Sequence, residues 1–241
     1  MLLRNNLKPK SLPRRILRWI GIAFLIWVIS SVLLVLVLRF VPPPISAVMI
    51  GRKIDALFDR EQDFTLRYRW TPMTEVSSNL PIALVSAEDQ KFPTHHGFDV
   101  DAIQTALAEA EDGSRLRGAS TISQQVAKNL FLWNGRSFIR KGFEVYFTVL
   151  VETLWPKRRI IEVYLNIAEF GNGVYGVGAA SERYFHTSPQ QLTPHQCALL
   201  AAVLPSPRKL HAERPSSYVQ RRADWIERQV RQLGGPAYLD D

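Results

Sequence analysis

The sequence predicts a mainly α-helical domain that follows a single membrane-spanning helix. Three observations support this fold class. An uncharged apolar run covers residues 19–38, most later segments space their apolar residues as helices do, and alternating strand patterns are scarce. With 241 residues, the chain is long enough for one anchor and one domain of ordinary size. We expect a basic cytoplasmic tail at residues 1–18, a transmembrane anchor at 19–40 and the domain at 45–236.

The anchor is predicted from the run WIGIAFLIWVISSVLLVLVL, which extends from Trp19 to Leu38. A helix of this length spans about 30 Å, the thickness of the hydrocarbon core of a bilayer. A cleaved signal peptide is the alternative, but the run is longer than a signal core and no small-residue cleavage site follows it. Six cations precede the run. They predict a cytoplasmic N-terminus, with the domain on the periplasmic side of the cytoplasmic (inner) membrane.

The formal charge of +8 is concentrated around the anchor. Residues 1–40 carry seven Lys or Arg and no acid, whereas the rest of the chain holds 23 basic and 22 acidic side chains. We therefore expect no nucleic-acid partner. Residues 114–159 nevertheless hold nine cations and two acids. This local excess indicates either a directed anion site or a solvated helix face.

The first helices of the domain are predicted from caps and breakers. Asn79 and an early Pro suit the start of a helix over residues 79–90. The pair Asp112-Gly113 ends a helix over 101–111, and Ser and Thr caps open a helix over 120–132.

The later helices are predicted from apolar spacing and from Pro and Gly. Pro156 ends a long apolar helix over 138–155, and Gly171 ends an amphipathic helix over 157–170. Further helices are expected at residues 175–184, 193–204 and 217–233, and the best strand candidate is 63–70.

Glu88 lies at the end of an expected apolar helix and precedes His95 and His96. A carboxylate beside apolar residues has a raised pKa and can accept a proton near neutral pH. The alternative is a helix-terminal glutamate paired with a neighbouring cation. The two histidines lack the spacing of a metal motif. We expect a structural or hydrogen-bonding role for His95.

A polar run opens the next helix and offers groups that suit a diphosphate. Gln124 and Lys128 share a helix face, and Ser120 and Thr121 lie at the helix N-terminus, where backbone N–H groups attract anions. The alternative is ordinary N-capping and a solvated face.

A charged turn follows, with Arg136, Arg140, Lys141 and Glu144. The Arg140–Glu144 spacing is that of a common helix ion pair, worth about 0.3–0.5 kcal/mol when exposed. The apolar run 145–154 that follows indicates that this helix enters a core, where a charged first turn suits a site. Carboxylates and cations after a membrane span together predict a sugar phosphate substrate held in a bilayer.

Five ordered segments make the chain resemble the monofunctional biosynthetic peptidoglycan glycosyltransferases, a family that also forms the glycosyltransferase half of bifunctional penicillin-binding proteins. The resemblance covers roughly residues 45–210. The matching residues are Glu88-Asp89 with Phe92, His95 and Gly97; Gly118 to Ile122 with Gln124-Gln125 and Lys128-Asn129; Arg140-Lys141 with Glu144; Lys157 with Ile161-Glu162 and Tyr164 to Asn166; and Tyr175 to Val177 with Ala179-Ala180 and Tyr184-Phe185.

The resemblance implies a lysozyme-like helical fold and polymerisation of lipid II into glycan strands. By motif position, Glu88 is the catalytic base, Glu144 a second essential carboxylate, and Lys128 and Arg136 phosphate ligands. Tyr164 and Asn166 are expected to be mostly structural. Further residues expected to line the diphosphate cleft are Ser120, Gln124, Gln125, Arg140 and Lys141.

In the implied reaction, the growing glycan on a polyprenyl diphosphate is transferred to the sugar 4-hydroxyl of lipid II, with inversion. Diphosphate leaves as a stable anion, so the reaction needs cations rather than a strong acid. We expect no required cofactor and no resident metal, although Mg²⁺ or Mn²⁺ could contact Glu88-Asp89. Expected partners are lipid II, the polyprenyl-diphosphate glycan and the membrane; other cell-wall synthesis or division proteins are candidates.

Three other functions were weighed. A glycan-cleaving lysozyme or lytic transglycosylase needs a proton donor for its sugar leaving group and has little use for a cationic cleft. A silent membrane-bound scaffold would not need Glu88 and Glu144. Ser206 and Lys209 have the S-x-x-K spacing of penicillin-binding serine enzymes, but only about thirty residues follow, so we expect no transpeptidase.

Overall fold

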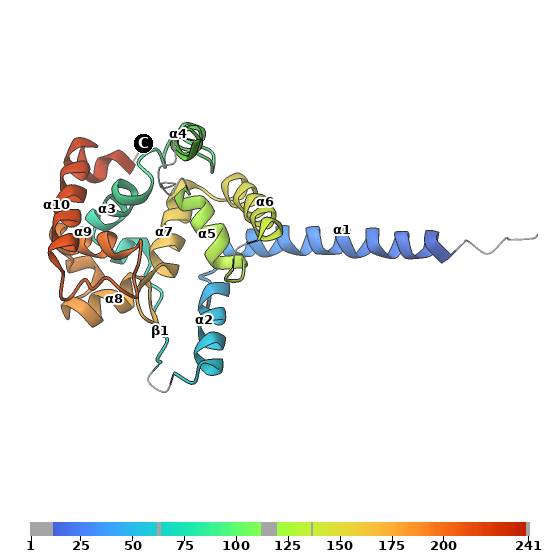
Figure 1. Ribbon diagram of the computed structural model, residues 1–241, viewed down its shortest axis with the longest axis horizontal. Helices are drawn as coiled ribbons and strands as arrows, with labels where there is room; N and C mark the ends of the chain where they lie inside the picture. Colours follow the sequence, from blue (N-terminus) through green and yellow to red (C-terminus); the bar gives the residue numbers. More distant parts are fainter. Residues whose placement is uncertain (1–11, 62–63, 112–119, 136, 240–241) are drawn as a thin grey trace, which may run out of the picture. The chain divides into compact units, whose positions relative to one another are not determined.

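The computed structural model describes residues 12–61, 64–111, 120–135 and 137–239 (Figure 1). The chain separates into two units, residues 1–41 and 42–241. The described part of the first unit is essentially one helix, α1, which spans Leu12–Leu38. Its segment Arg14–Leu38 is long and apolar enough to cross a membrane, and no other described helix meets that test. The prediction of one N-terminal apolar helix is therefore confirmed, and the helix also takes in part of the basic tail.

The second unit is mainly helical, as predicted. Short strands and 3₁₀ turns connect its helices. In chain order the elements are α2 (Ala47–Phe58), β1 (Arg67–Tyr68), η1 (Met73–Glu75), α3 (Asn79–Glu88), α4 (Val100–Glu111), α5 (Ile122–Phe131), α6 (Phe138–Leu154), α7 (Lys157–Ile167), β2 (Glu169–Gly171), β3 (Val174–Tyr175), α8 (Gly176–Phe185), η2 (Pro189–Gln191), α9 (Pro194–Val203), α10 (Ser217–Gln232) and η3 (Gly235–Leu239).

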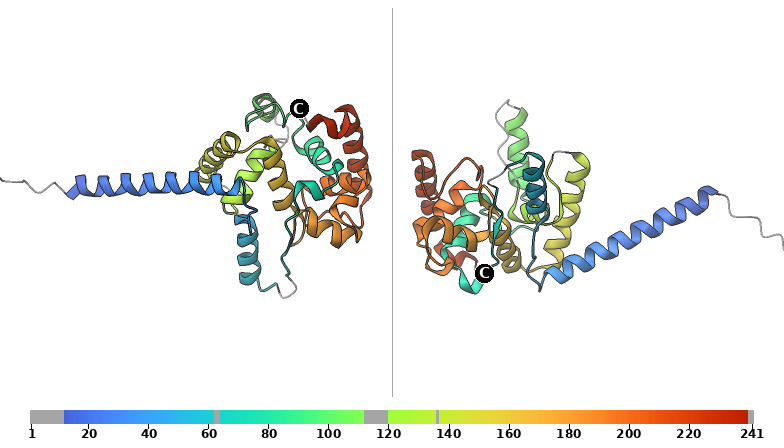
Figure 2. Two further views of the ribbon diagram at one scale, coloured as in Figure 1. Left: turned by 180° about the vertical axis from the view of Figure 1, so that it is seen from behind. Right: turned by 90° about the horizontal axis from the view of Figure 1, so that it is seen from below.

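The core of this unit lies around α3, α7 and α9. Seven consecutive residues of α3, from Leu80 to Ser86, are buried, as are seven consecutive residues of α9, from Cys197 to Val203. α10 packs against both α9 and α3 through Val219, Ala223 and Ile226 (Figure 2). Because most of α3 is buried, its last residue, Glu88, lies at the edge of the core with its side chain 17% exposed.

A small three-stranded sheet, in the order β1-β3-β2, joins α7 to α8. β1 pairs with β3 in parallel, and β2 pairs with β3 in antiparallel. Gly176 starts α8 at a φ of +78°, and a Cβ there would lie 2.5 Å from the carbonyl oxygen of Asn166. The Asn166 side chain accepts a hydrogen bond from the backbone N–H of Thr71 and donates one to its carbonyl, each at 2.8 Å. Asn166 thus has the structural role expected of it.

Several sequence-based boundaries were wrong. The helix α2 was not predicted; Ser46 caps it by accepting a hydrogen bond from Met49 N at 3.2 Å. The strand expected at 63–70 is only two residues long, Arg67–Tyr68. The helix expected at 157–170 ends at Ile167, because Glu169 begins β2.

Candidate active site

Glu88 is the last residue of α3, and three elements meet at its carboxylate. Gln125 of α5 donates a hydrogen bond from Nε2 to Glu88 Oε2 at 2.9 Å. Arg222 of α10 places its Nη2 3.9 Å from Glu88 Oε1. Burial raises the pKa of Glu88, and the hydrogen bond from Gln125 and the charges of Arg222 and Lys128 offset only part of this rise. The carboxylate anticipated at this position therefore has a raised pKa and is partly buried, and Arg222 is its neighbouring cation.

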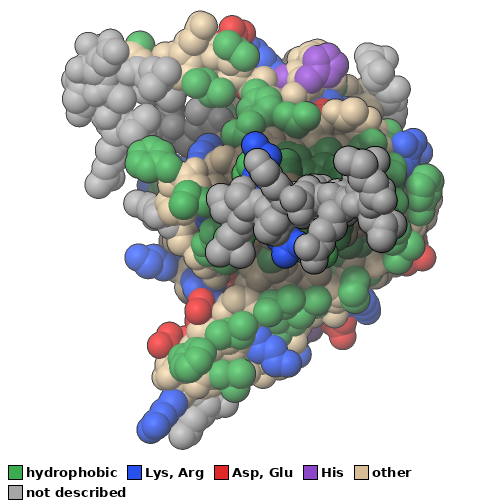
Figure 3. All heavy atoms as spheres, turned by 90° about the vertical axis from the view of Figure 1, so that its right-hand side faces the viewer, with side chains coloured by type: hydrophobic (Ala, Val, Ile, Leu, Met, Phe, Trp, Pro, Cys, Tyr) green, Lys and Arg blue, Asp and Glu red, His purple; other side chains and the backbone are tan. Residues whose placement is uncertain are grey.

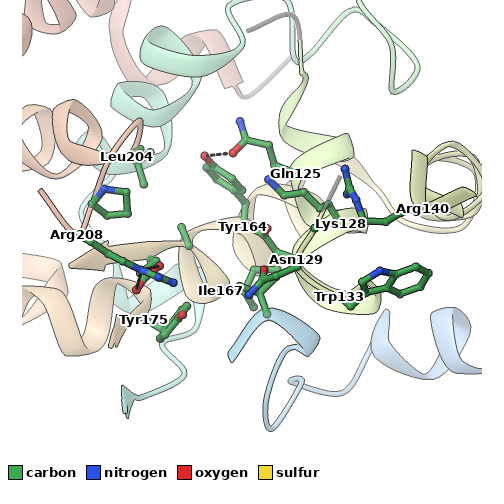
Figure 4. Close-up of a pocket in the computed structure, with 16 residues that line it drawn as sticks. Gln125, Lys128, Asn129, Trp133, Arg140, Tyr164, Ile167, Tyr175, Leu204 and Arg208 are labelled. Carbon is green, nitrogen blue, oxygen red and sulfur yellow. Dashed lines mark hydrogen bonds and ion pairs between the residues drawn. The ribbon is translucent and has the colours of Figure 1, made fainter. Parts of the chain in front are cut away.

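Gln125 connects Glu88 to Tyr164 of α7. The Tyr164 hydroxyl donates to Gln125 Oε1 at 3.2 Å, and the two side chains face each other in Figure 4. Burial raises the pKa of Tyr164 well above its ordinary value, so the hydroxyl keeps its proton and remains a donor. With Oε1 occupied by this hydroxyl, the amide N–H group of Gln125 is directed to Glu88. Tyr164 was expected to be mostly structural, and its contact with Gln125 was not predicted from the sequence.

A buried network joins the end of α3 to the start of α5. Gly97 N donates to His95 Nδ1 at 3.0 Å, which leaves the proton of His95 on Nε2, 2.8 Å from Asp89 Oδ2. The same Asp89 oxygen accepts from the backbone N–H of Ile122 at 2.8 Å. Thr121 Oγ1 donates to the Gly97 carbonyl at 2.7 Å. This network confirms the hydrogen-bonding role of His95 and fixes α5 relative to Glu88.

Two side chains at the N-terminus of α5 make hydrogen bonds within the protein itself. Thr121 and Gln124 form a reciprocal capping box: Thr121 N donates to Gln124 Oε1 at 3.0 Å, and Gln124 N donates to Thr121 Oγ1 at 3.2 Å. Gln124 is buried. Ser120 is exposed and lies outside the cavity described next. The structure does not bring Ser120 or Gln124 to the other predicted ligands.

Beside Gln125 lies a cavity of about 520 Å³ with cations at both ends. Lys128 and Arg140 line one end, and Arg208 lines the other (Figure 4). Burial lowers the pKa of Lys128, and the charge of Glu144 opposes this shift. In the part of the chain that the structure describes, the Lys128 ammonium makes no ion pair. An ammonium left in this state is suited to an anionic ligand.

Glu144 lies behind these cations, on α6. It is buried, and its two carboxylate oxygens contact Arg140 Nη1 at 3.0 Å and Lys141 Nζ at 2.5 Å. Neither Glu144 nor Lys141 lines the cavity. The helix ion pair expected between Arg140 and Glu144 is present, and it is buried rather than exposed. Arg136, the other predicted phosphate ligand, lies outside the described residues.

Arg208 and Arg222 are neighbours of the site that the sequence analysis missed. Arg208 Nε lies 3.2 Å from Glu169 Oε1 at the end of the cavity away from Lys128. Arg222 approaches Glu88 from α10, 134 positions further along the chain. The sequence around Arg208 or Arg222 does not predict a position at the site, because each residue is brought there by the packing of segments that are distant in the chain.

The carboxylate of Asp89 accepts hydrogen bonds from His95 and from the backbone N–H of Ile122. Among the described residues, no group of three or more His, Cys, Asp or Glu side chains could hold a metal ion.

A buried glutamate beside a cavity lined by cations agrees with what comparisons with known proteins show. The transglycosylase family model matches residues 56–231. The chain belongs to the transglycosylase family. A protein of Xanthomonas campestris pv. campestris (strain B100), named a biosynthetic peptidoglycan transglycosylase, is 54% identical over 232 residues, which are 96% of this chain and 94% of that protein. A protein of the same name from Xylella fastidiosa (strain 9a5c) is 55% identical over 219 residues, 91% of this chain and 90% of that protein.

Membership of the transglycosylase family makes the chain a glycosyltransferase with the lysozyme-like helical fold that the resemblance implied. The matched region contains α3 with Glu88, α5 with Lys128 and α10 with Arg222. All the groups that meet at the candidate site therefore lie within the family domain.

Proposed function

We propose that this transglycosylase polymerises peptidoglycan glycan strands, by transferring a growing polyprenyl-diphosphate-linked glycan to the sugar 4-hydroxyl of lipid II and releasing polyprenyl diphosphate. The observation that carries the proposal is the double position of Gln125. Gln125 donates a hydrogen bond to the partly buried carboxylate of Glu88, and it also lines the cavity that Lys128 and Arg140 line. Proton removal and charge stabilisation are thus placed on adjacent groups.

Glu88 acts as the general base. Its raised pKa makes it a better proton acceptor than an ordinary glutamate while the neighbouring Gln125, Arg222 and Lys128 still favour the ionised form. The carboxylate takes the proton of the attacking 4-hydroxyl as the oxygen bonds to the anomeric carbon. Direct displacement at that carbon inverts its configuration. Tyr164 holds the amide of Gln125 in the orientation that supports the ionised carboxylate.

Lys128 and Arg140 stabilise the charge that develops on the departing diphosphate. The Nε of Arg140 is buried and lacks a hydrogen-bond partner among the described residues, so it can donate to a phosphate oxygen. Glu144 fixes Arg140 and Lys141 through its two ion pairs and so acts as a positioning residue. Arg136 joins this set by its motif position. No general acid is needed, because diphosphate is a stable leaving group.

The same arrangement disfavours glycan hydrolysis. A glycosidase must protonate the sugar oxygen that leaves. Most glycosidases also use a second carboxylate near the first, and this carboxylate needs an unpaired oxygen to act as base or nucleophile. Glu144 instead has both oxygens in ion pairs with cations. The site therefore holds one carboxylate able to exchange a proton with substrate, which suits transfer from a diphosphate.

The lipid-linked substrates are reached from the cytoplasmic (inner) membrane. The apolar α1 anchors the chain as a single-pass helix, with the N-terminal cations in the cytoplasm and the domain on the periplasmic side. Within the domain, apolar side chains are exposed on α2 and at the start of α6: Phe58 is 83%, Phe138 98% and Ile139 72% exposed. Figure 3 shows hydrophobic side chains along the projection formed by α2. We assign the α2–α6 surface to contact with lipid.

No cofactor takes part in this mechanism. The cations of the protein supply the charge that a divalent metal would otherwise contribute, so chelation by EDTA should leave polymerisation in place. Other cell-wall synthesis or division proteins remain candidate partners.

Incubation of the purified chain with labelled lipid II tests the proposal. We expect high-molecular-weight glycan that lysozyme degrades, and its absence with Glu88→Gln. Shortening of preformed strands would identify a hydrolase. Activity that survives Glu88→Gln unchanged would remove the base from the mechanism.

A further inference from the structure

A second hollow lies on α10, the helix that carries Arg222 to Glu88. An open depression of about 510 Å³ is lined by four residues of α10: Tyr218, Arg221, Arg222 and Trp225. Arg222 belongs to both regions, because it lines this depression and its Nη2 lies 3.9 Å from Glu88 Oε1. Arg222 therefore links the depression to the candidate base, although Glu88 itself does not line the depression.

The four residues occupy positions i, i+3, i+4 and i+7 of α10, so they share one face of the helix. Val219, Ala223 and Ile226 bury a neighbouring face and fix α10 in place. Tyr218 and Trp225 are 49% and 38% exposed. Two aromatic rings thus stand about two turns apart on a rigid helix, with two guanidinium groups between them.

Arg222 has unused hydrogen-bonding capacity. Its side chain is 26% exposed, and its Nε is buried with no partner among the described residues. Its contact with Glu88 is 3.9 Å, longer than a charge-assisted hydrogen bond. A guanidinium in this state can turn part of its donor fork to a ligand in the depression.

We propose that the α10 face formed by Tyr218, Arg221, Arg222 and Trp225 binds the growing glycan strand, through sugars beyond the one whose anomeric carbon reacts. This inference rests on the proposed polymerase function. Aromatic rings present flat apolar surfaces on which sugar rings stack, and guanidinium groups pair with the carboxylates of the stem peptides on peptidoglycan sugars.

The position of α10 distinguishes the growing strand from the incoming lipid II. α10 lies at the end of the domain opposite α6, as Figures 1 and 2 show from three directions. The exposed apolar residues that we assign to lipid lie on α2 and α6. Lipid II must keep its polyprenyl chain at that surface, whereas the distal sugars of a growing strand leave the membrane. We therefore assign the α10 face to the growing strand rather than to lipid II.

The test measures strand binding and strand length together. Purified full-length chain is titrated calorimetrically with a soluble peptidoglycan tetrasaccharide that carries stem peptides, and its lipid II products are sized by gel. For Trp225→Ala, the loss of a sugar stack should weaken tetrasaccharide binding by about tenfold. Products should shorten, because elongation falls more than formation of the first bond. Trp225→Leu is a second variant that keeps an apolar side chain if the alanine variant unfolds.

Arg221→Gln separates the carboxylate contact from the sugar contact. It should weaken binding of the peptide-bearing tetrasaccharide but not of chitotetraose, which has no carboxylate. Arg183→Gln, at an exposed position of α8, removes the same charge elsewhere and serves as the matched control.

Tetrasaccharide binding and product length that stay at wild-type values in Trp225→Ala and Trp225→Leu would overturn the α10 inference while leaving polymerisation intact. A wild-type chain that forms no glycan from lipid II would instead refute the proposed function itself. Shortened products with unchanged tetrasaccharide binding would also contradict the inference, because the defect would then not arise from strand contact.

Discussion

The orientation of Gln125 is the most specific mechanistic feature of this site, and removing it has a predictable effect. Gln125 donates to Glu88 at 2.9 Å and accepts from Tyr164 at 3.2 Å. Gln125→Leu removes the donor while keeping a side chain of similar volume. The hydrogen bond from Gln125 lowers the pKa of Glu88, so its loss raises that pKa further.

The magnitude follows from the kind of hydrogen bond. A hydrogen bond to a charged group contributes about 1.5–3 kcal/mol, so kcat/KM at neutral pH should fall about 10- to 100-fold in Gln125→Leu. Tyr164→Phe removes only the neutral bond that orients the amide. That bond is worth about 1 kcal/mol, so we expect a loss of about fivefold.

The assay is the initial rate of lipid II polymerisation as a function of pH. Activity requires ionised Glu88 and is lost as the pH falls through its pKa, so the acid limb should move to higher pH in both variants. Tyr68→Phe is the matched control, because it also removes one tyrosine hydroxyl bond, to the Pro43 carbonyl at 2.6 Å, but away from Glu88. Acid limbs that coincide with that of the wild type in both site variants would refute this account of Gln125.

Three further predictions concern charge and backbone. Lys128→Met should lower kcat/KM about 100-fold, a loss of about 3 kcal/mol of charge stabilisation. Because burial lowers the pKa of Lys128, the wild-type rate should also fall at alkaline pH, where the ammonium loses its proton. A wild-type rate that stays constant at alkaline pH would contradict the role of Lys128. Glu88→Gln should stabilise the folded chain against urea at pH 7–8. Folding raises the pKa of Glu88, so an ionised Glu88 lowers the free energy of unfolding, and glutamine removes this cost. The gain should vanish below about pH 4, where glutamates are protonated in the unfolded chain as well. Gly176→Ala should lower the free energy of unfolding, measured in urea, by about 3 kcal/mol. A Cβ at this position would lie 2.5 Å from Asn166 O, and the φ of +78° is unfavourable for alanine. Gly142→Ala is the control and should not destabilise the chain, because open space surrounds Gly142.

The sequence predicted those parts of the site that depend on local pattern. Glu88 could be placed at a helix end because the apolar residues before it mark a buried helix, and the helix ion pair of Arg140 with Glu144 follows from their spacing. Lys128 was placed correctly on a helix next to these residues. Each of these predictions required only the period of a helix and the identity of neighbouring residues.

Gln124 has a structural role that the sequence itself indicates. Thr121 and Gln124 have the Thr-x-x-Gln spacing of a capping box, which assigns both side chains to the start of α5. The capping bond uses Oε1 of Gln124. Whether Gln124 also contacts the diphosphate stays a prediction.

Arg222 and Tyr164 illustrate what the sequence could not provide. Arg222 lies on an amphipathic helix with several other arginines, and only the packing of α10 against α3 singles it out. The contact between Tyr164 and Gln125 depends on how α7 meets α5. Contacts of this kind are set by tertiary structure, which local propensity does not specify.

In the proposed mechanism, the ion pairs of Glu144 give this second acid a role that needs no proton transfer. A carboxylate buried between Arg140 and Lys141 gives the trio a net charge of +1 and restrains two flexible cations. Without it, Arg140, Lys141 and the nearby Lys128 would repel one another, and each would move toward solvent. Charge stabilisation of a leaving diphosphate depends on donors that are already in place when the bond breaks. Glu144 therefore contributes by holding Arg140 at the edge of the cavity, where its buried Nε faces no competing partner among the described residues.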